Sequence, residues 1–141
     1  MNEFSAIMGI LNLEKVDNEI LKRKRLVDKY CELLRDVKGI TILDYVGDYK
    51  RNYAYFPILV DKEVFGISRD CVSDELKKHN IFVRKYFYPL ITDYECYRKN
   101  FDSGLTPIAL KVSREVLTLP LYGDLELNDV MMICSIILNM R

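Results

Sequence analysis

Past its middle the chain reads IFVRKYFYPL, from Ile81 to Leu90. The stretch begins as an apolar, β-prone run and passes without a break into a pair of cations, three aromatic residues and Pro-Leu. This composition predicts a β-strand over residues 81–88. A strand that ends in arginine, lysine and tyrosine carries charge and phenol groups to the edge of a sheet, where we expect a ligand or partner surface.

The segments on either side of this strand alternate between helix and strand patterns. The expected elements, in chain order, are a helix over 2–37, a strand over 41–45, a polar turn over 47–52, a strand over 53–60, a helix over 68–79, the strand over 81–88, a short helix over 93–100, a helix over 107–117, an extended joint at 119–121 and a helix over 127–140. This order predicts an α+β fold: a small, mostly antiparallel sheet of three to four strands packed with helices and preceded by a long N-terminal helix. We expect a single domain over residues 1–141, with the long helix in 1–38 and an α+β sandwich in 40–141.

The first helix is too long for a compact domain of this size. About 35 residues span roughly 50 Å, whereas a 141-residue domain has a diameter under about 40 Å. We therefore expect the helix, which should end at a Gly39 C-cap, either to break near residues 14–18 or to protrude. Protrusion would expose an apolar face that another surface must cover, which predicts a homodimer or another association through this helix. The residues of this association face are Phe4, Ile7, Met8 and Leu11.

The composition narrows the classes of partner and the compartment. Lys plus Arg number 21 and Asp plus Glu number 21, so the balanced charge gives no reason to expect a nucleic acid or a membrane surface as partner. The four cysteines are widely spaced without a C-x-x-C pair, which predicts scattered, buried free thiols and no metal site. The N-terminus lacks the features of a signal peptide, and no apolar run is long enough to span a membrane, so we expect a cytoplasmic protein.

Catalytic constellations are scarce in this sequence. The single histidine, His79, falls at a predicted helix end, where a solvated imidazole is ordinary. No phosphate-binding glycine loop occurs among the six glycines. We therefore assign no catalytic residue to the chain.

The most suggestive side chains lie in the opening stretch. Arg84, Tyr86 and Tyr88 have the i, i+2, i+4 spacing that places side chains on one face of a strand. One interpretation is that the tyrosine rings pack between sheet and helices with their hydroxyls at the rim. The other is that the three side chains line a pocket for an anionic or sugar ligand. A basic, aromatic strand can also stack single-stranded RNA bases, although the balanced charge argues against a nucleic-acid binder.

Three groups of segments resemble a known enzyme family when taken in order. They are MNEFSAIMG at 1–9, followed by LEKVD at 13–17 and the basic stretch 22–25; RKYFYPL at 84–90, followed by 94–98; and SREVLTLPLY at 113–122. Together they are similar to the C-terminal part of the DegT/DnrJ/EryC1/StrS sugar aminotransferases, which are pyridoxal-phosphate enzymes of the aspartate-aminotransferase fold.

The resemblance implies the small domain of such an enzyme without its large domain. In the family, the large domain supplies the lysine that forms the Schiff base, the phosphate cup and the groups that hold the pyridine ring. The parent reaction moves an amino group from glutamate to a keto-sugar nucleotide. Arg84, Tyr86 and Tyr88 would lie at the substrate periphery, and Ile91 stands where the family has a histidine. We therefore expect no native pyridoxal-phosphate binding and no activity from this chain alone; a self-associating or partner-binding module is the alternative.

Overall fold

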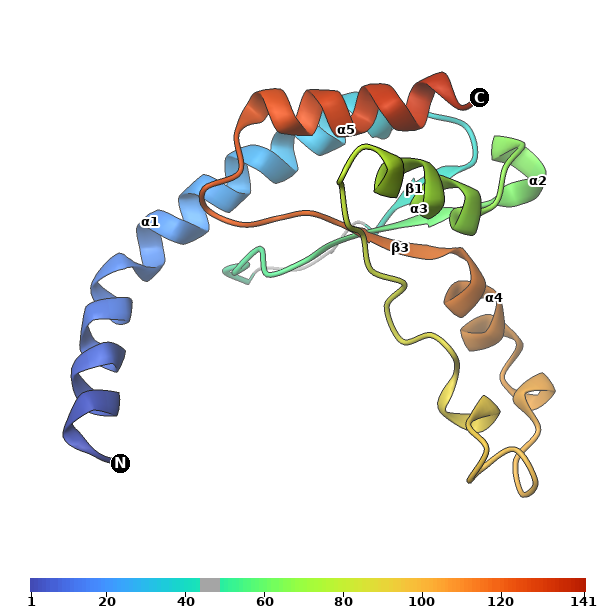
Figure 1. Cartoon of the computed structure of the whole chain (residues 1–141), viewed down its shortest axis with the longest axis horizontal. Coiled ribbons are helices and arrows are strands. Elements are labelled where there is room, and N and C mark those ends of the chain that lie inside the picture. Colours follow the sequence, from blue (N-terminus) through green and yellow to red (C-terminus); the bar gives the residue numbers. More distant parts are fainter. Residues whose placement is uncertain (44–48) are drawn as a thin grey trace.

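The structure is a computed structural model that describes residues 1–43 and 49–141. In chain order its elements are α1 (Glu3–Leu34), β1 (Ile40–Ile42), β2 (Phe56–Val60), α2 (Lys62–Phe65), α3 (Arg69–Lys78), the 3-10 turns η1 (Ile91–Asp93) and η2 (Ser103–Leu105), α4 (Pro107–Glu115), β3 (Val116–Leu119) and α5 (Leu127–Asn139). The predicted α+β class is confirmed: a small antiparallel sheet packs with helices behind a long first helix (Figure 1).

The sheet has the order β1-β2-β3 with both pairs antiparallel. In β2, Phe56, Ile58 and Val60 are buried, whereas Pro57 and Leu59 between them are half-buried. Ile58 lies opposite Leu117 of β3, and Pro57 lies opposite Thr118. The alternation assigns Ile58 and Leu117 to the face that packs on the helices, and Pro57 and Thr118 to the other face.

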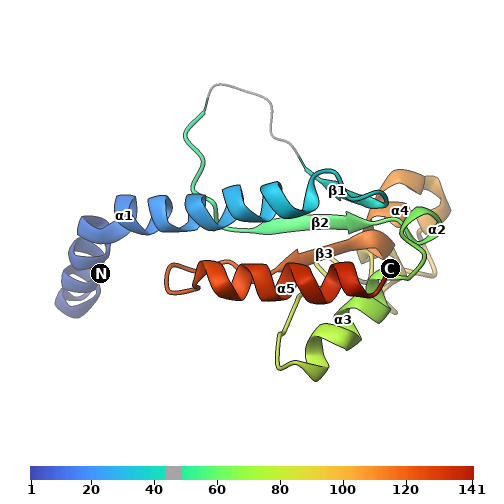
Figure 2. The same cartoon turned by 90° about the horizontal axis from the view of Figure 1, so that it is seen from above.

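The core lies between the sheet and three helices. The C-terminal half of α1 and the whole of α5 run side by side over the sheet (Figure 2), and α3 packs beside them against α5 and β3. The ring of Tyr30 in α1 stacks on Phe56 with centroids 4.8 Å apart, and its hydroxyl donates to the Pro120 carbonyl at 3.0 Å. Because Tyr30 is fully buried, this one side chain joins α1, β2 and the loop after β3.

Helix α1 protrudes and does not break. It begins at an Asn2 N-cap, whose side chain accepts from the Ser5 amide, and continues without interruption to Leu34. Its axis bends, so that its first turns extend away from the body (Figures 1 and 2). Phe4 is 82% exposed, and Ile7, Met8 and Leu11 are exposed as well. The structure describes no chain against this face, so its role in association stays a prediction.

The predicted end of the first helix is wrong. The helix stops at Leu34, and Gly39 lies five residues later, in the turn that leads into β1. Gly39 has a φ of +86°, and a Cβ there would clash with the backbone of Phe65. Gly39 is therefore required by a left-handed turn packed on α2, a short helix that the sequence reading missed.

The predicted strand over 81–88 is also wrong. Only Arg84 pairs with a neighbour, in an isolated antiparallel bridge to Thr118. Phe87 has a φ of +51°, which is left-handed and ends the extended backbone. The third strand is instead β3. The sequence patterns assign part of its residues 116–119 to the end of the predicted helix over 107–117 and part to the predicted joint at 119–121. All four residues of β3 are buried, so a run too short to show a clear period forms the strand at this edge of the sheet.

The other elements differ from prediction mainly at their ends. Ser68 caps α3 by accepting from the Cys71 amide, and α3 and α5 end within a residue or two of their predicted ends. The expected strand over 53–60 is shortened to β2. The expected helix over 93–100 is replaced by η1 and turns, in a segment that extends away from the sheet (Figure 1). Residues 44–45 of the first expected strand and 47–48 of the expected turn lie outside the described residues.

Candidate functional site

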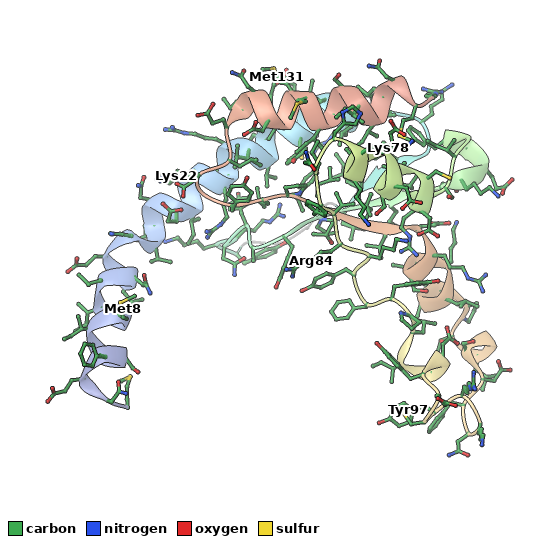
Figure 3. All side chains as sticks on the ribbon, in the orientation of Figure 1. Met8, Lys22, Lys78, Arg84, Tyr97 and Met131 are labelled. Carbon is green, nitrogen blue, oxygen red and sulfur yellow. The ribbon has the colours of Figure 1, made fainter. Side chains whose placement is uncertain are left out.

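Arg84 lies on the face of the sheet that is turned away from α1 and α5. Its amide donates to the Thr118 carbonyl at 3.2 Å, and the Thr118 amide donates to the Arg84 carbonyl at 2.8 Å. Two residues that exchange both hydrogen bonds in an antiparallel bridge project their side chains to the same face. Arg84 is exposed, and Figure 3 shows it on the concave side of the molecule, between the first turns of α1 and the segment over 91–106.

A cleft of about 290 Å³ opens beside Arg84. It is lined by Ala54, Tyr55, Phe82, Arg84, Thr118, Leu119, Pro120, Leu121 and Tyr122. Thr118 is 8% exposed, and its hydroxyl oxygen is buried without a hydrogen-bond partner among the described residues. In the same part of the chain, Arg84 forms no ion pair with a carboxylate. An unpaired guanidinium and aromatic walls suit a ligand that has negatively charged oxygens and a flat or apolar part.

Tyr86 extends this site through Tyr55. The two rings lie with their centroids 5.0 Å apart at an angle of 50°. A hydrogen bond with the Tyr55 side chain raises the pKa of Tyr86, so the Tyr86 phenol stays protonated at neutral pH. Arg84 and Tyr86 are therefore brought to one region, as the sequence spacing predicts.

Tyr88 does not join them. Its ring lies under the guanidinium of Arg69, with 4.5 Å between Arg69 Cζ and the ring centroid. The predicted single face for Arg84, Tyr86 and Tyr88 is wrong because the left-handed Phe87 turns the backbone between the last two. The role of all three at a substrate periphery remains a prediction.

Sequence reasoning missed a polar cluster near the site that is centred on one buried residue, Arg69. It consists of Arg69, Asp70 and Lys85, with Asp70 Oδ1 3.0 Å from Arg69 Nε and 2.6 Å from Lys85 Nζ. The hydrogen bond from Lys85, aided by the Arg69 charge, lowers the pKa of Asp70 against the opposing effect of burial. One signal was visible: Arg69 follows the N-cap serine, where the helix dipole disfavours a cation.

The described residues do not fit an imine-forming cofactor site. None of the twelve lysines is buried. Lys22, Lys24 and Lys78 each donate to a carboxylate that raises the pKa of the ammonium, whereas a Schiff-base lysine needs its pKa lowered.

Other chemical groups are dispersed over the described residues. No three potential metal ligands gather there. His79 is half-exposed at the end of α3, 3.6 Å from Glu75. The prediction of buried thiols holds for Cys134, but Cys71 and Cys96 are exposed. The same part of the chain contains no helix suited to crossing a membrane.

Comparisons with known proteins find a matching family and relatives of this chain. The model of the DegT/DnrJ/EryC1/StrS aminotransferase family matches residues 1–138. The chain is 41% identical over 140 residues to a dTDP-4-amino-4,6-dideoxy-D-glucose transaminase of Escherichia coli, covering 98% of this chain and 38% of the relative. It is 36% identical over 126 residues to the Shigella dysenteriae enzyme of the same name, covering 89% of this chain and 34% of that one. The chain thus spans between a third and two fifths of the length of these relatives.

Solved structures with a similar fold include aminotransferases. DesI, determined in the presence of its TDP-sugar product, is 28% identical and superposes with a TM-score of 0.87 over 96% of this chain and 34% of its own. The Helicobacter pylori aminotransferase PseC shares the fold at 23% identity, with a TM-score of 0.85 over 99% of this chain and 37% of its own. The chain belongs to the DegT/DnrJ/EryC1/StrS aminotransferase family.

Proposed function

We propose that these residues form the small domain of a pyridoxal-phosphate-dependent nucleotide-sugar aminotransferase, and that they do not transaminate alone. The parent reaction moves an amino group from glutamate to a keto-sugar nucleotide. The observation that carries the proposal is the unpaired Arg84 beside a cleft on the open face of a domain of this family. The E. coli relative is named for a dTDP-sugar, whose diphosphate is an anion that a guanidinium can bind in a bidentate manner.

The proposed division of labour follows from the side chains present. Pyridoxal phosphate, when bound to the parent enzyme, supplies the electron sink for amino transfer. This chain supplies Arg84 as an anion contact and the Tyr55–Tyr86 pair as hydroxyl donors at the edge of the site. Tyr88 acts farther out, because its ring is occupied by Arg69. Ile91, in place of the family's histidine, is 71% exposed and offers no polar group to the substrate.

A chimera tests the proposal. The matched portion of the E. coli relative is replaced by this chain in one polypeptide, and amino transfer from glutamate to the corresponding 4-keto sugar nucleotide is followed by chromatography. We expect turnover, and we expect Arg84→Gln to raise KM for the sugar nucleotide at least about tenfold, as loss of a charged hydrogen bond implies. Arg98→Gln, which removes an exposed guanidinium in the 91–106 segment, is the matched control. A folded, cofactor-loaded chimera without turnover would refute the proposal.

The inactivity of the chain alone has a separate test. The purified chain is mixed with pyridoxal phosphate and scanned for an imine absorbance band. We expect no stoichiometric band, since no lysine is buried and carboxylate partners raise the pKa values of Lys22, Lys24 and Lys78. A stoichiometric band that disappears on mutation of one particular lysine would contradict this expectation.

The exposed face of α1 supports a second proposal, association between copies of the chain. Phe4, Ile7, Met8 and Leu11 have the helical i, i+3, i+4, i+7 spacing, and each is 46% or more exposed. Sedimentation equilibrium at about 100 μM should show a dimer that Phe4→Asp converts to monomer, because a charge in an apolar interface is costly. Asn12→Asp, on the same arm, is the control. A monomeric wild-type chain would end this proposal.

We also propose a cytoplasmic location for the chain, which cell fractionation with an antibody against it would test. Recovery in an extracytoplasmic fraction would contradict the proposal.

A further inference from the structure

The side chain of Arg69 makes specific polar contacts that the packing of an apolar core does not require. Arg69 is 2% exposed although it carries a permanent charge. Its Nη1 donates to the carbonyl of Ser113 at 2.8 Å and to the carbonyl of Val116 at 3.0 Å. Ser113 lies in the last turn of α4, where helix carbonyls lack partners within the helix and carry the negative end of the dipole. One guanidinium therefore joins the start of α3 to the junction of α4 and β3.

The same side chain also reaches the stretch that contains the candidate site. Arg69 Cζ lies 4.5 Å from the centroid of the Tyr88 ring, in a cation–π contact. Through Asp70, which accepts from Arg69 Nε at 3.0 Å, the cluster also binds Lys85 Nζ at 2.6 Å. Lys85 and Tyr88 lie on either side of Tyr86, so two of the ties that hold this stretch start from one buried residue and its neighbour. The other two are the Arg84–Thr118 bridge and the contact of the Tyr86 ring with Tyr55.

The backbone between these ties has little other support. Phe87 is left-handed and 82% exposed, and no regular strand runs through residues 84–88. A stretch without a hydrogen-bond ladder is easily opened locally. The positions of Arg84 and Tyr86 relative to the cleft thus depend on side-chain ties, and chiefly on those that Arg69 organises.

We propose that Arg69 is a positioning residue, whose buried guanidinium fixes the Arg84–Tyr88 stretch so that Arg84 and Tyr86 face the ligand cleft. The inference rests on the proposed function for the identity of the ligand, but not for the anchoring itself. Arg69 touches no ligand; it acts through Tyr88, Asp70 and Lys85. A lysine could not replace it fully, because a single ammonium cannot bridge two carbonyls and a carboxylate while covering a ring.

Amide hydrogen exchange by NMR on the 141-residue chain measures the anchoring. In Arg69→Met, we expect protection of the Arg84 and Thr118 amides to fall at least about tenfold relative to the α5 amides, with partial rescue in Arg69→Lys. Tyr88→Leu should lower protection of the Arg84 amide, whereas Tyr88→Phe, which keeps the ring, should not. These Tyr88 variants leave Arg69 in place and decide the matter if Arg69→Met does not fold. Lys78→Gln removes an exposed ion pair in the same helix and is the matched control.

A titration with dTDP separates the anchoring from the function. In the wild-type chain we expect shifts of the Tyr86 ring and the Arg84 side-chain signals, and in Arg69→Met we expect these shifts to be lost while the α5 signals persist. Unchanged Arg84 protection in folded Arg69→Met and Tyr88→Leu would overturn the positioning role, as would a fall that is equal throughout the chain. If dTDP shifts no signals of the wild-type chain but Arg69→Met lowers the protection of the Arg84 amide, the result would count against the proposed ligand and support the anchoring.

Discussion

The buried thiol of Cys134 predicts a specific loss of stability at alkaline pH. Cys134 is 1% exposed, in the face of α5 that packs on the core, and burial raises the pKa of its thiol from 9.0 to about 12. Above pH 9 the unfolded chain releases this proton and the folded chain keeps it, so the unfolded state binds fewer protons. The free energy of unfolding must then fall with rising pH, by at most about 1.36 kcal/mol per unit, until the folded thiol also ionises near pH 12.

The magnitude follows from the two pKa values. With 9.0 and about 12, the thiol costs the fold about 2.6 kcal/mol at pH 11 relative to pH 8. Urea unfolding with a reducing agent at several pH values between about 8 and 11 should therefore show that the free energy of unfolding falls less over this range in Cys134→Ala than in wild type, by this amount. Any loss from the cavity that alanine leaves is the same at every pH and does not affect the comparison. Cys71→Ala, at an exposed thiol, is the control. Parallel pH curves for wild type and Cys134→Ala would refute the reasoning.

Three further predictions concern the sheet and the site. Asp70 has a pKa below its ordinary value, so the stability it contributes is present above about pH 4 and is lost as pH falls through the folded pKa. The free energy of unfolding should therefore fall less steeply with decreasing pH in Asp70→Asn than in wild type, whereas Asp74→Asn should leave this dependence unchanged. Thr118→Val, which removes a buried hydroxyl without a partner among the described residues and keeps the shape, should raise the free energy of unfolding by about 1 kcal/mol; a loss of stability would show that the hydroxyl has a partner. Gly39→Ala should lower the melting temperature by several degrees, since the left-handed turn leaves no room for a Cβ beside Phe65; an unchanged temperature would contradict the tight turn.

The sequence predicts well what depends on long periodic patterns. The helices α1, α3 and α5 each have enough turns for an apolar stripe to show, and Ser68 marks its helix start by its own side-chain chemistry. The α+β class follows from their order. The length of α1 alone was enough to predict that it breaks or protrudes.

The errors occur where a few residues and a single backbone angle decide the structure. Residues 81–88 have strand composition, but the left-handed φ of Phe87 prevents continued pairing, and nothing in a Tyr-Phe-Tyr run announces it. Residues 116–119 follow a helix too closely for their own period to appear, yet they form the buried strand β3. Composition indicates which residues are apolar, whereas the free edge of β2 determines which of two apolar runs becomes the strand.

The candidate site is exposed because β3, and not the stretch over residues 81–88, forms the third strand. If residues 81–88 were the third strand, Arg84 would lie within a ladder, and its neighbours would be fixed by backbone hydrogen bonds. With β3 in that position, the described residues join the stretch to the sheet at the Arg84–Thr118 bridge, and the Arg84 side chain is exposed beside the cleft. Its placement must then come from side chains, and the buried guanidinium of Arg69 contacts α4, β3 and this stretch together. Residues 81–90, despite their strand composition, thus form a surface segment, and the residue that orders it, Arg69, lies at the start of α3, twelve positions before Ile81.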